Sequence, residues 1–343
     1  MFTIPTLFAL SLIIYYTTTF FSPIQRVALF MPTSPYRHPG HDIYSVIDEL
    51  IEKYRLNDPF YVQYSVWIGG VLKGNLGYSY SHHKPVIDAI LQNLPATLEL
   101  VMYAAPIIFL GGYRLGVFSA RRAHKKAPKD DITDSAIRTV SIFGYSIPQF
   151  CIGLLLLVIF YMCLGWFKLG RLASDCEAFL RSSGWTHYTG LYTVDALLNG
   201  EPWIFWDALK HLVLPVITLS TGMLPIVMRV TRSAVLGELA MPYVTTAKAK
   251  GLDEKAVSRH AERNSLSSVL TVSGILLASM LTGVVVTEHV FLIRGLGSMT
   301  VNAAQNFDYP LLIGLALTFC LFLALINLLV EIVYARINPR VTL

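Results

Sequence analysis

The chain has 343 residues, of which 54% are hydrophobic and 14% are charged, with a formal net charge of +5. Soluble globular proteins carry about 25% charged residues, so this composition and several long apolar runs exclude an ordinary soluble domain and indicate an integral membrane protein. Basic residues gather in particular loops, so the positive charge is interpreted as membrane topology and no nucleic-acid partner is expected. The four cysteines show no CxxC spacing, which argues against a zinc site or redox motif.

Six apolar segments are about as long as the roughly 20 residues that an α-helix needs to cross the bilayer. They cover residues 2–21, 98–120, 139–164, 209–230, 269–290 and 311–335. The first has neither the positive n-region nor the small-residue cleavage site of a secretory signal, and it is therefore predicted as a transmembrane helix. Pro148, Pro215 and Pro225 lie inside later segments, where membrane helices tolerate proline. The predicted fold is all-α, with six transmembrane helices.

Lysine and arginine concentrate in the loops after the second and fourth segments and in the C-terminal tail. These basic residues are Arg121, Arg122, Lys125, Lys126, Lys129, Arg138, Arg232, Lys248, Lys250, Lys255, Arg259, Arg263, Arg336 and Arg340. The positive-inside rule places both loops and the tail in the cytoplasm. With six spans, the N-terminus is cytoplasmic as well.

Two long loops are then extracytoplasmic. The first follows the first span, and its segment 44–54 places Val46, Ile47, Leu50 and Ile51 on one face of an expected helix. Four glycines that follow are expected to break regular structure: Gly69, Gly70, Gly74 and Gly77. The second loop, residues 165–207, is rich in Trp and Tyr. It either caps the outer mouth of a pathway or covers the membrane interface.

The sequence lacks the motifs of nucleotide hydrolysis and of common hydrolases. It contains no G-x-x-x-x-G-K-[ST] phosphate loop and no HExxH, GxSxG or EF-hand pattern. The adjacent His82 and His83 are interpreted as surface residues rather than metal ligands. No catalytic residue, cofactor site or metal site is therefore predicted, and the chain is not expected to be an enzyme.

Ionisable residues are nearly absent from the middle of the predicted spans. Five lie near span ends, where they can reach the interface: Glu99, Arg114, Arg229, Glu288 and Glu331. Proton pumps and secondary transporters instead place such groups near the bilayer centre. This distribution argues against a proton relay, so energy for transport would have to enter from elsewhere.

The loop after the fourth span is polar and has helix-forming residues. Residues 243–250 can form a short helix, which Gly251 can end, and Asp253 can N-cap a second short helix. One face of that second helix would carry Ala256, Val257, His260 and Ala261. The residues alone support two interpretations equally. One is a basic loop attracted to anionic membrane lipid, and the other is a docking element for a cytosolic partner.

An ordered set of short motifs extends over nearly the whole chain. In the polar loop, "TAKAKGL" places Ala247 four residues before Gly251, and "RHAERN" follows at 259–264. Elsewhere stand "YRLNDPFYVQY", "GGVLKGNLGYSY", "NLPATLEL", "SIPQFCIGLLL", "HLVLPVITL", "RGLGSM", "DYPLLIG" and "INPR". The set resembles the permease subunits of the dipeptide/oligopeptide family of ABC importers, whose cytoplasmic loop carries a relaxed "EAA" motif. Thr245 stands where the stricter motif has an acidic residue.

This resemblance implies a first transmembrane helix at 1–22, an extracytoplasmic region at 23–93, a type I importer transmembrane domain at 94–335 and a cytoplasmic tail at 336–343. It also implies a coupling helix in a loop at about 241–266. The residues expected to dock an ATPase are Tyr243, Thr246, Ala247, Ala249, Lys250, Gly251 and Leu252.

The implied partners are a homologous second permease, one or two cytosolic ABC ATPase subunits that carry ATP and Mg²⁺, an extracytoplasmic substrate-binding protein and membrane lipid. The implied substrates are dipeptides or oligopeptides, with oligosaccharides or nickel as alternatives, and the implied location is the cell membrane. A channel or secondary carrier that works without an ATPase is the alternative from another class.

Overall fold

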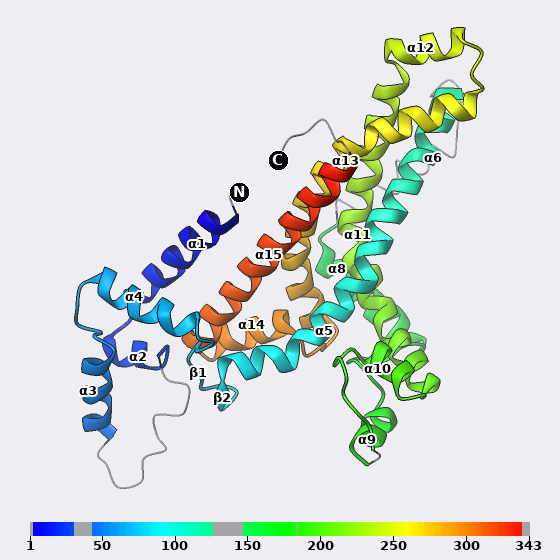
Figure 1. The fold of residues 1–343 in the computed structure, drawn as a ribbon. Helices are drawn as coiled ribbons and strands as arrows, with labels where there is room; N and C mark the ends of the chain where they lie inside the picture. The colour runs from blue at the N-terminus through cyan, green and yellow to red at the C-terminus, as the bar shows by residue number, and fades with distance from the viewer. Residues whose placement is uncertain (1–2, 31–42, 126–146, 183, 338–343) are drawn as a thin grey trace. The chain divides into compact units, whose positions relative to one another are not determined.

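The computed structural model describes residues 3–30, 43–125, 147–182 and 184–337, which are mostly helical (Figure 1). They form two compact units along the chain. Unit 1 comprises Met1–Thr97 and Arg294–Leu325, and unit 2 comprises Leu98–Ile293 and Ile326–Leu343. The division falls inside two helices, α5 (Val86–Pro106) and α15 (Tyr309–Ile337).

Unit 1 contains the N-terminal helices and the first parts of α5 and α15. Its other elements are α1 (Thr3–Thr18), α2 (Pro23–Val27), α3 (Ile43–Lys53), α4 (Phe60–Val71), β1 (Tyr78–Ser79), β2 (Lys84–Pro85) and α14 (Leu296–Gln305). The strands are antiparallel and pair Tyr78 with Pro85. The predicted amphipathic helix is confirmed as α3. Its apolar residues Ile47, Leu50 and Ile51 pack against a core that includes the buried Trp67.

The prediction for the glycines was only partly right. Gly69 and Gly70 lie inside α4, because that helix continues to Val71. Gly74 follows it in a turn and Gly77 lies directly before β1, with φ values of 84° and 92°. Such conformations favour glycine because it has no Cβ atom.

Asp308 joins the β-hairpin region to the start of α15 within unit 1. Its side chain is buried, and its Oδ2 atom accepts hydrogen bonds from the Ser79 hydroxyl at 2.6 Å and the Ser81 amide at 2.9 Å. The Ser81 hydroxyl donates to the same oxygen. Oδ1 accepts from the Leu311 amide at 3.3 Å in the first turn of α15. One carboxylate therefore holds two segments that are far apart in sequence.

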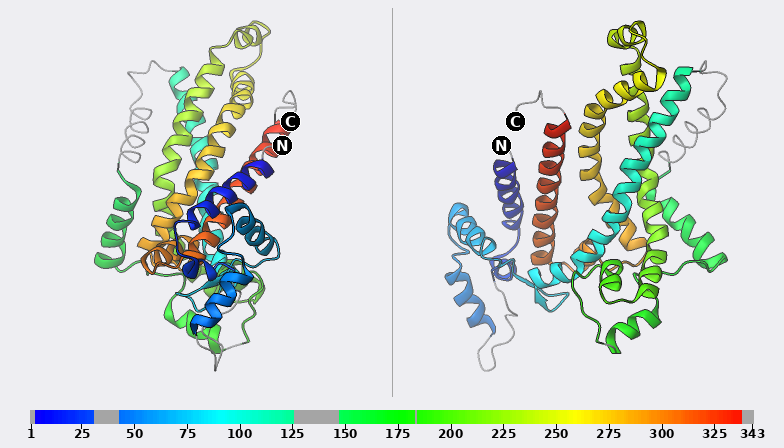
Figure 2. Two further views of the ribbon diagram at one scale, coloured as in Figure 1. Left: turned by 90° about the vertical axis from the view of Figure 1, so that its left-hand side faces the viewer. Right: turned by 45° about the vertical axis from the view of Figure 1, so that its right-hand side comes forward.

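Unit 2 is built around the long helix α11 (Pro202–Leu239). The other elements are the π-helical segments η1 (Ile107–Gly111) and η2 (Leu157–Cys163), and the helices α6 (Gly112–Lys125), α8 (Gln149–Leu156), α9 (Ser174–Ser182), α10 (Tyr192–Leu198), α12 (Pro242–Ala249) and α13 (Glu254–Val290). Both turned views show α6 and α13 running alongside α11 (Figure 2). Buried apolar residues from α5, α11 and α13 form the largest core, which includes Leu100, Leu219 and Met280.

Small residues allow α6 and α11 to approach closely. A Cβ atom added at Gly116 would lie 2.6 Å from the Met228 carbonyl oxygen and 2.6 Å from Thr231 Cβ. Gly112 meets Val227 at a similar distance. Small residues are enriched at helix contacts in membranes because they permit such backbone approach.

Among the described residues, four helical segments are long and apolar enough to cross a membrane: Val86–His124, Pro202–Leu239, Glu254–Val290 and Tyr309–Arg336. The prediction of a multi-pass membrane fold is confirmed to this extent, and the described residues are mostly helical with one short β-hairpin. Pro5–Thr18 and Gln149–Cys163 are shorter apolar helices at the predicted first and third spans. Part of the predicted third span lies outside the described residues, so the count of six remains a prediction. Pro215 and Pro225 are accommodated inside α11, as predicted.

The expectation that all five ionisable residues reach the interface was wrong for two of them. Glu99 and Glu288 are 2% and 0% exposed, whereas Arg114, Arg229 and Glu331 are exposed. Glu99 is stabilised within unit 2 by Arg171, whose guanidinium donates to it at 2.6 Å. The Thr193 amide and hydroxyl also donate to Glu99, each at 2.8 Å. Glu99 lies inside α5, and its charge is buried where the connection between η2 and α11 supplies its partners.

Candidate docking site at the α11–α13 connection

The short helix α12 lies between the ends of the two long helices α11 and α13. Figure 1 shows it crossing at one end of unit 2, while α9 and α10 lie at the opposite end of α11. Pro242 occupies the first turn of α12, where its missing N–H costs no helical hydrogen bond. The short helix predicted at residues 243–250 is thus present, displaced by one residue at each end.

Gly251 forms the corner after α12, with a φ of 80°. The Leu252 amide donates to the Ala247 carbonyl at 3.2 Å, and the Gly251 amide donates to the Lys248 carbonyl at 3.0 Å. These two bonds form a Schellman motif, which ends a helix with a residue in the left-handed conformation. The four-residue spacing between Ala247 and Gly251 therefore has a direct backbone explanation, because Ala247 supplies the carbonyl that closes the corner.

Asp253 caps the next helix, as predicted. Its carboxylate accepts a hydrogen bond from the Ala256 amide at 3.0 Å. The predicted second short helix is not separate, however, since α13 continues without a break to Val290. Of the residues expected on one face of it, Val257 and Ala261 are buried, but His260 is exposed. The corner is therefore joined rigidly to a helix long enough to span the membrane.

One face of α12 packs against the rest of unit 2. Val244 is 3% exposed, and the half-buried Ala247 packs against the same apolar cluster, which includes Val235, Val257 and Ala261. Sequence reasoning missed Val244 as an anchor, although its three-residue spacing from Ala247 is the signal for a shared helical face. These contacts fix α12 on the helices that it connects.

The opposite face carries most of the predicted docking residues. Except for Ala247, these residues are exposed: Tyr243, Thr246, Ala249, Lys250, Gly251 and Leu252. The Tyr243 hydroxyl donates to a Glu238 carboxylate oxygen at 2.8 Å. Burial and this contact with Glu238 raise the pKa of Tyr243, so the phenol stays neutral at physiological pH. The site thus presents a neutral and basic surface.

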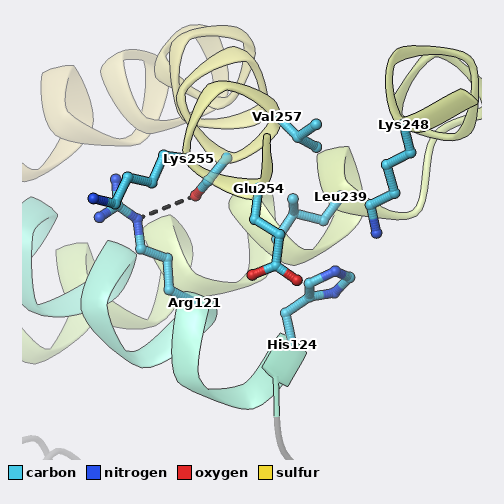
Figure 3. A pocket seen from close by; sticks show the side chains of 8 residues that line it. Arg121, His124, Leu239, Lys248, Glu254, Lys255 and Val257 are labelled. Carbon is cyan, nitrogen blue, oxygen red and sulfur yellow. Dashed lines mark hydrogen bonds between the residues drawn. The ribbon is translucent and has the colours of Figure 1, made fainter. Parts of the chain in front are cut away.

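A pocket opens beside α12, between the ends of α6, α11 and α13 (Figure 3). It is lined by Arg121, His124, Leu239, Lys248, Glu254, Lys255, Val257 and Ser258. Figure 3 shows the Glu254 carboxylate directed toward the His124 imidazole, and Lys248 extending from α12 toward the same space. The pocket wall therefore has four basic side chains and one carboxylate.

A polar contact joins α6 to α13 at the edge of this pocket. The Arg121 guanidinium donates from Nε to the Glu262 carboxylate at 2.6 Å and to the Ser258 hydroxyl at 3.1 Å. Ser258 in turn donates to Glu262 at 2.7 Å. These partners are more than 130 positions from Arg121 in sequence, so sequence reasoning gave no signal for them. They position the end of α6 against the helix that follows the corner.

The described residues contain no group of three or more His, Cys, Asp and Glu side chains arranged to hold a metal. His82, in the loop between β1 and β2, instead lies with Nδ1 3.0 Å from the Ser81 hydroxyl. Burial lowers the pKa of His82, and Lys84 lowers it further. A surface role for His82 is compatible with these contacts.

Residues 112–343 match the protein family described as binding-protein-dependent transport system inner membrane component. The chain belongs to this family. The matched region extends from the start of α6 to the last residue and includes α12 and the pocket. The chain is therefore a membrane component of a transport system.

Curated relatives agree with this membership over most of the chain. A di/tripeptide transport system permease protein, DppB, from Pseudomonas aeruginosa is 38% identical over 85% of this chain and 84% of its own length. The oligopeptide transport system permease protein AppB of Bacillus subtilis is 33% identical over 86% of this chain and 84% of its own. A probable D,D-dipeptide permease, DdpB, of Escherichia coli K12 is 35% identical over 87% and 84%. The resemblance to dipeptide/oligopeptide permeases inferred from the motifs is confirmed.

Proposed function

We propose that this chain is the permease subunit of an ATP-driven importer of dipeptides or oligopeptides. The observation that carries the proposal is α12. It is anchored by Val244 and Ala247, closed by the Gly251 corner and exposed along its other face. This is the form expected of an element that transmits movement from a docked partner, within a chain that is similar to peptide permeases over more than four fifths of its length.

In this proposal six helices cross the membrane, and both termini and α12 lie in the cytoplasm. The exposed residues of α12 contact a cytosolic ATPase that binds ATP and Mg²⁺. Because α12 ends in a rigid corner continuous with α13, displacement of α12 would move a membrane-spanning helix as a body. Hydrolysis takes place on the partner, and this chain contributes the pathway.

The remaining partners follow from the same proposal. A homologous permease supplies the other half of the pathway, and an extracytoplasmic binding protein delivers the substrate. Loop segments with α9 and α10, at the end of α11 opposite α12, would face that binding protein. Peptides are the proposed substrates because the relatives are named as dipeptide, tripeptide and oligopeptide permeases.

The test is reconstitution of the chain in liposomes with its permease partner, the ATPase subunits and the binding protein. Peptide uptake that requires ATP and all four components supports the proposal. Uptake without the ATPase would instead indicate a channel or secondary carrier. Ligands released from the purified binding protein distinguish peptides from oligosaccharides and nickel.

A further inference from the structure

The exposed side of α13 is polar along the part of the helix that is apolar enough to cross a membrane. From Asn264 to the end of the helix, the exposed residues are Asn264, Ser268, Thr271, Ile275, Ser279, Thr282 and His289. Successive members are three, four or seven positions apart, so they lie along one face of the helix. All of them except Ile275 are polar. The part of this face from Ser268 to Thr282 is called the hydroxyl face below.

A neighbouring apolar helix has the opposite character on its exposed side. The large exposed side chains of α8 and η2 are hydrophobic, as lipid tails require: Phe150, Leu154, Leu155, Val158, Ile159, Tyr161 and Met162. The Gln149 amide of α8 donates to the Thr287 hydroxyl of α13 at 3.0 Å, so these exposed sides lie at a similar depth. The polarity of the hydroxyl face is therefore a property of α13 and not of its depth in the membrane.

Serine and threonine can face lipid when their hydroxyls bond to their own helix. Thr271 and Ser279 do so, and each donates to the carbonyl four positions earlier at 3.1 Å. Among the residues that the structure describes, however, the hydroxyls of Ser268 and Thr282 form no hydrogen bond. Because a hydroxyl without a partner is unfavourable in hydrocarbon, both ends of the hydroxyl face need water or another polar partner.

Ile275 lies at the middle of the hydroxyl face, and its side chain is 64% exposed. At a rise of 1.5 Å per residue, the face from Ser268 to Thr282 is about 21 Å long, which is shorter than the hydrocarbon core of roughly 30 Å. Water that reached both ends of the face would meet one large apolar side chain halfway. Apolar constrictions of this kind close aqueous pores because they exclude water.

We propose that the hydroxyl face of α13 lines the aqueous pathway of the importer and that Ile275 is the apolar constriction of that pathway. The inference rests on the proposed function and adds the residues of the pathway to it. Serine and threonine hydroxyls both donate and accept hydrogen bonds, so they match the amide and carbonyl groups that all peptides share. Such a lining binds the peptide backbone weakly and does not depend on the peptide's side chains.

Thiol accessibility in the assembled importer tests the lining. Ser268→Cys, Ser279→Cys and Thr282→Cys should react with a cationic methanethiosulfonate reagent, because the thiolate that it attacks forms only in water. Peptide mass spectrometry separates these sites from the native cysteines. Phe150→Cys is the matched control, since it is exposed at a similar depth among hydrophobic side chains, and it should react about tenfold more slowly.

The labelling is carried out both without nucleotide and with ATP, so that either state of the pathway can expose the face. Equal rates at Ser279→Cys and Phe150→Cys would overturn the proposal, because they would place both sides in the same environment. Protection of all three α13 cysteines in both states would also overturn it, because another helix would then cover the face.

A leak measurement tests the constriction. In liposomes that contain the assembled importer without ATP, Ile275→Ser should increase the passive leak of a small ion about tenfold, because it replaces the apolar barrier with a hydroxyl. Ile275→Leu is the matched control, since it keeps a large apolar side chain and should leak as slowly as wild type. A wild-type rate of leak through the assembled Ile275→Ser importer would show that Ile275 does not close the pathway.

Peptide uptake tests the chemistry of the lining. Thr282→Val removes one hydroxyl at nearly constant volume and should lower the uptake of acidic, basic and apolar dipeptides by the same factor. Thr282→Ser restores a hydroxyl and should recover most of the loss. Unchanged uptake by the valine variant, or a loss confined to one class of dipeptide, would contradict backbone recognition. If the wild-type importer shows no ATP-dependent uptake, the proposed function itself fails, while thiol accessibility still tests the lining.

Discussion

The guanidinium of Arg171 lies 2.6 Å from the carboxylate of Glu99, and their side chains are only 14% and 2% exposed. The same guanidinium donates to the Gly190 carbonyl at 3.1 Å and lies 4.0 Å from the centre of the Tyr192 ring. Since Glu99 also accepts two hydrogen bonds from Thr193, one carboxylate on α5 holds two separate parts of the connection between η2 and α11. That connection is therefore fastened by polar contacts as well as by its apolar core.

Arg171→Met should destabilise the protein strongly, because it leaves the Glu99 charge buried without its partner. Breaking a buried ion pair from one side costs about 3–5 kcal/mol. Unfolding of the purified permease in detergent, followed by denaturant titration, measures the loss. The double variant Glu99→Gln/Arg171→Met should be less destabilised than the single one, since it removes the uncompensated charge. A single variant as stable as wild type would contradict this role for the pair.

Close packing of α6 on α11 predicts opposite effects at two helical glycines. Gly116→Ala should destabilise by about 1–3 kcal/mol, because the new methyl group would overlap the Met228 carbonyl. Gly237→Ala is the control, since no atom lies within 4 Å of the added Cβ and the residue is exposed on α11. It should be neutral or stabilising by up to about 1 kcal/mol. Thermal unfolding in detergent measures the change in stability of each variant. Equal melting temperatures for Gly116→Ala and Gly237→Ala would contradict the close contact between α6 and α11 at Gly116.

Local patterns in the sequence predicted the backbone of the connection between α11 and α13, because backbone geometry depends on neighbouring residues. Gly251 and Asp253 mark a helix end and a helix start within three positions, and both act as predicted. The long extension of α13 was not predicted. Residues 254–268 are polar enough to resemble a separate short helix, and no local signal shows that the helix continues into the apolar segment.

Contacts between distant residues could not be predicted from a single sequence. Glu99 lies 72 positions from Arg171, and nothing near Glu99 indicates that a loop will bury it. The pocket beside α12 could not be predicted for the same reason, because Arg121 contacts α13 only once the helices have packed together. The sequence pattern predicted the helices and which of their segments are polar or apolar. The burial of charged groups, in contrast, depends on how the helices pack together.

Cys176 should be unreactive toward maleimide in the folded protein. Burial, together with a hydrogen bond to Asp207 and that carboxylate's charge, raises the pKa of its thiol to about 12. At pH 8 the thiolate fraction would then be about one in ten thousand, against about one in four at an ordinary pKa. Cys163 is exposed and serves as the internal control. Peptide mapping after labelling should find Cys163 modified and Cys176 modified only after unfolding. Modification of Cys176 at the rate of Cys163 would contradict its burial.

Substitutions at Gly251 separate the conformation of the corner from the size of the residue. The φ of 80° disfavours β-branched side chains, at a cost of about 1–2 kcal/mol, while no atom lies within 4 Å of an added Cβ. Gly251→Val should therefore distort the backbone without a steric clash. We expect it to reduce ATP-dependent uptake in the reconstituted importer while the chain still inserts and pairs with its partner permease.

Gly251→Asn is the matched control, because asparagine adopts the left-handed conformation more readily than other residues with a side chain. It adds a side chain of similar size to valine and should retain most uptake and most ATPase association. Subunit co-purification must accompany each uptake measurement, so that loss of assembly is separated from loss of coupling. Normal uptake by the valine variant would show that transport does not depend on the corner. Equal loss in both variants would show that the exposed surface at residue 251, rather than its backbone conformation, is what the partner requires.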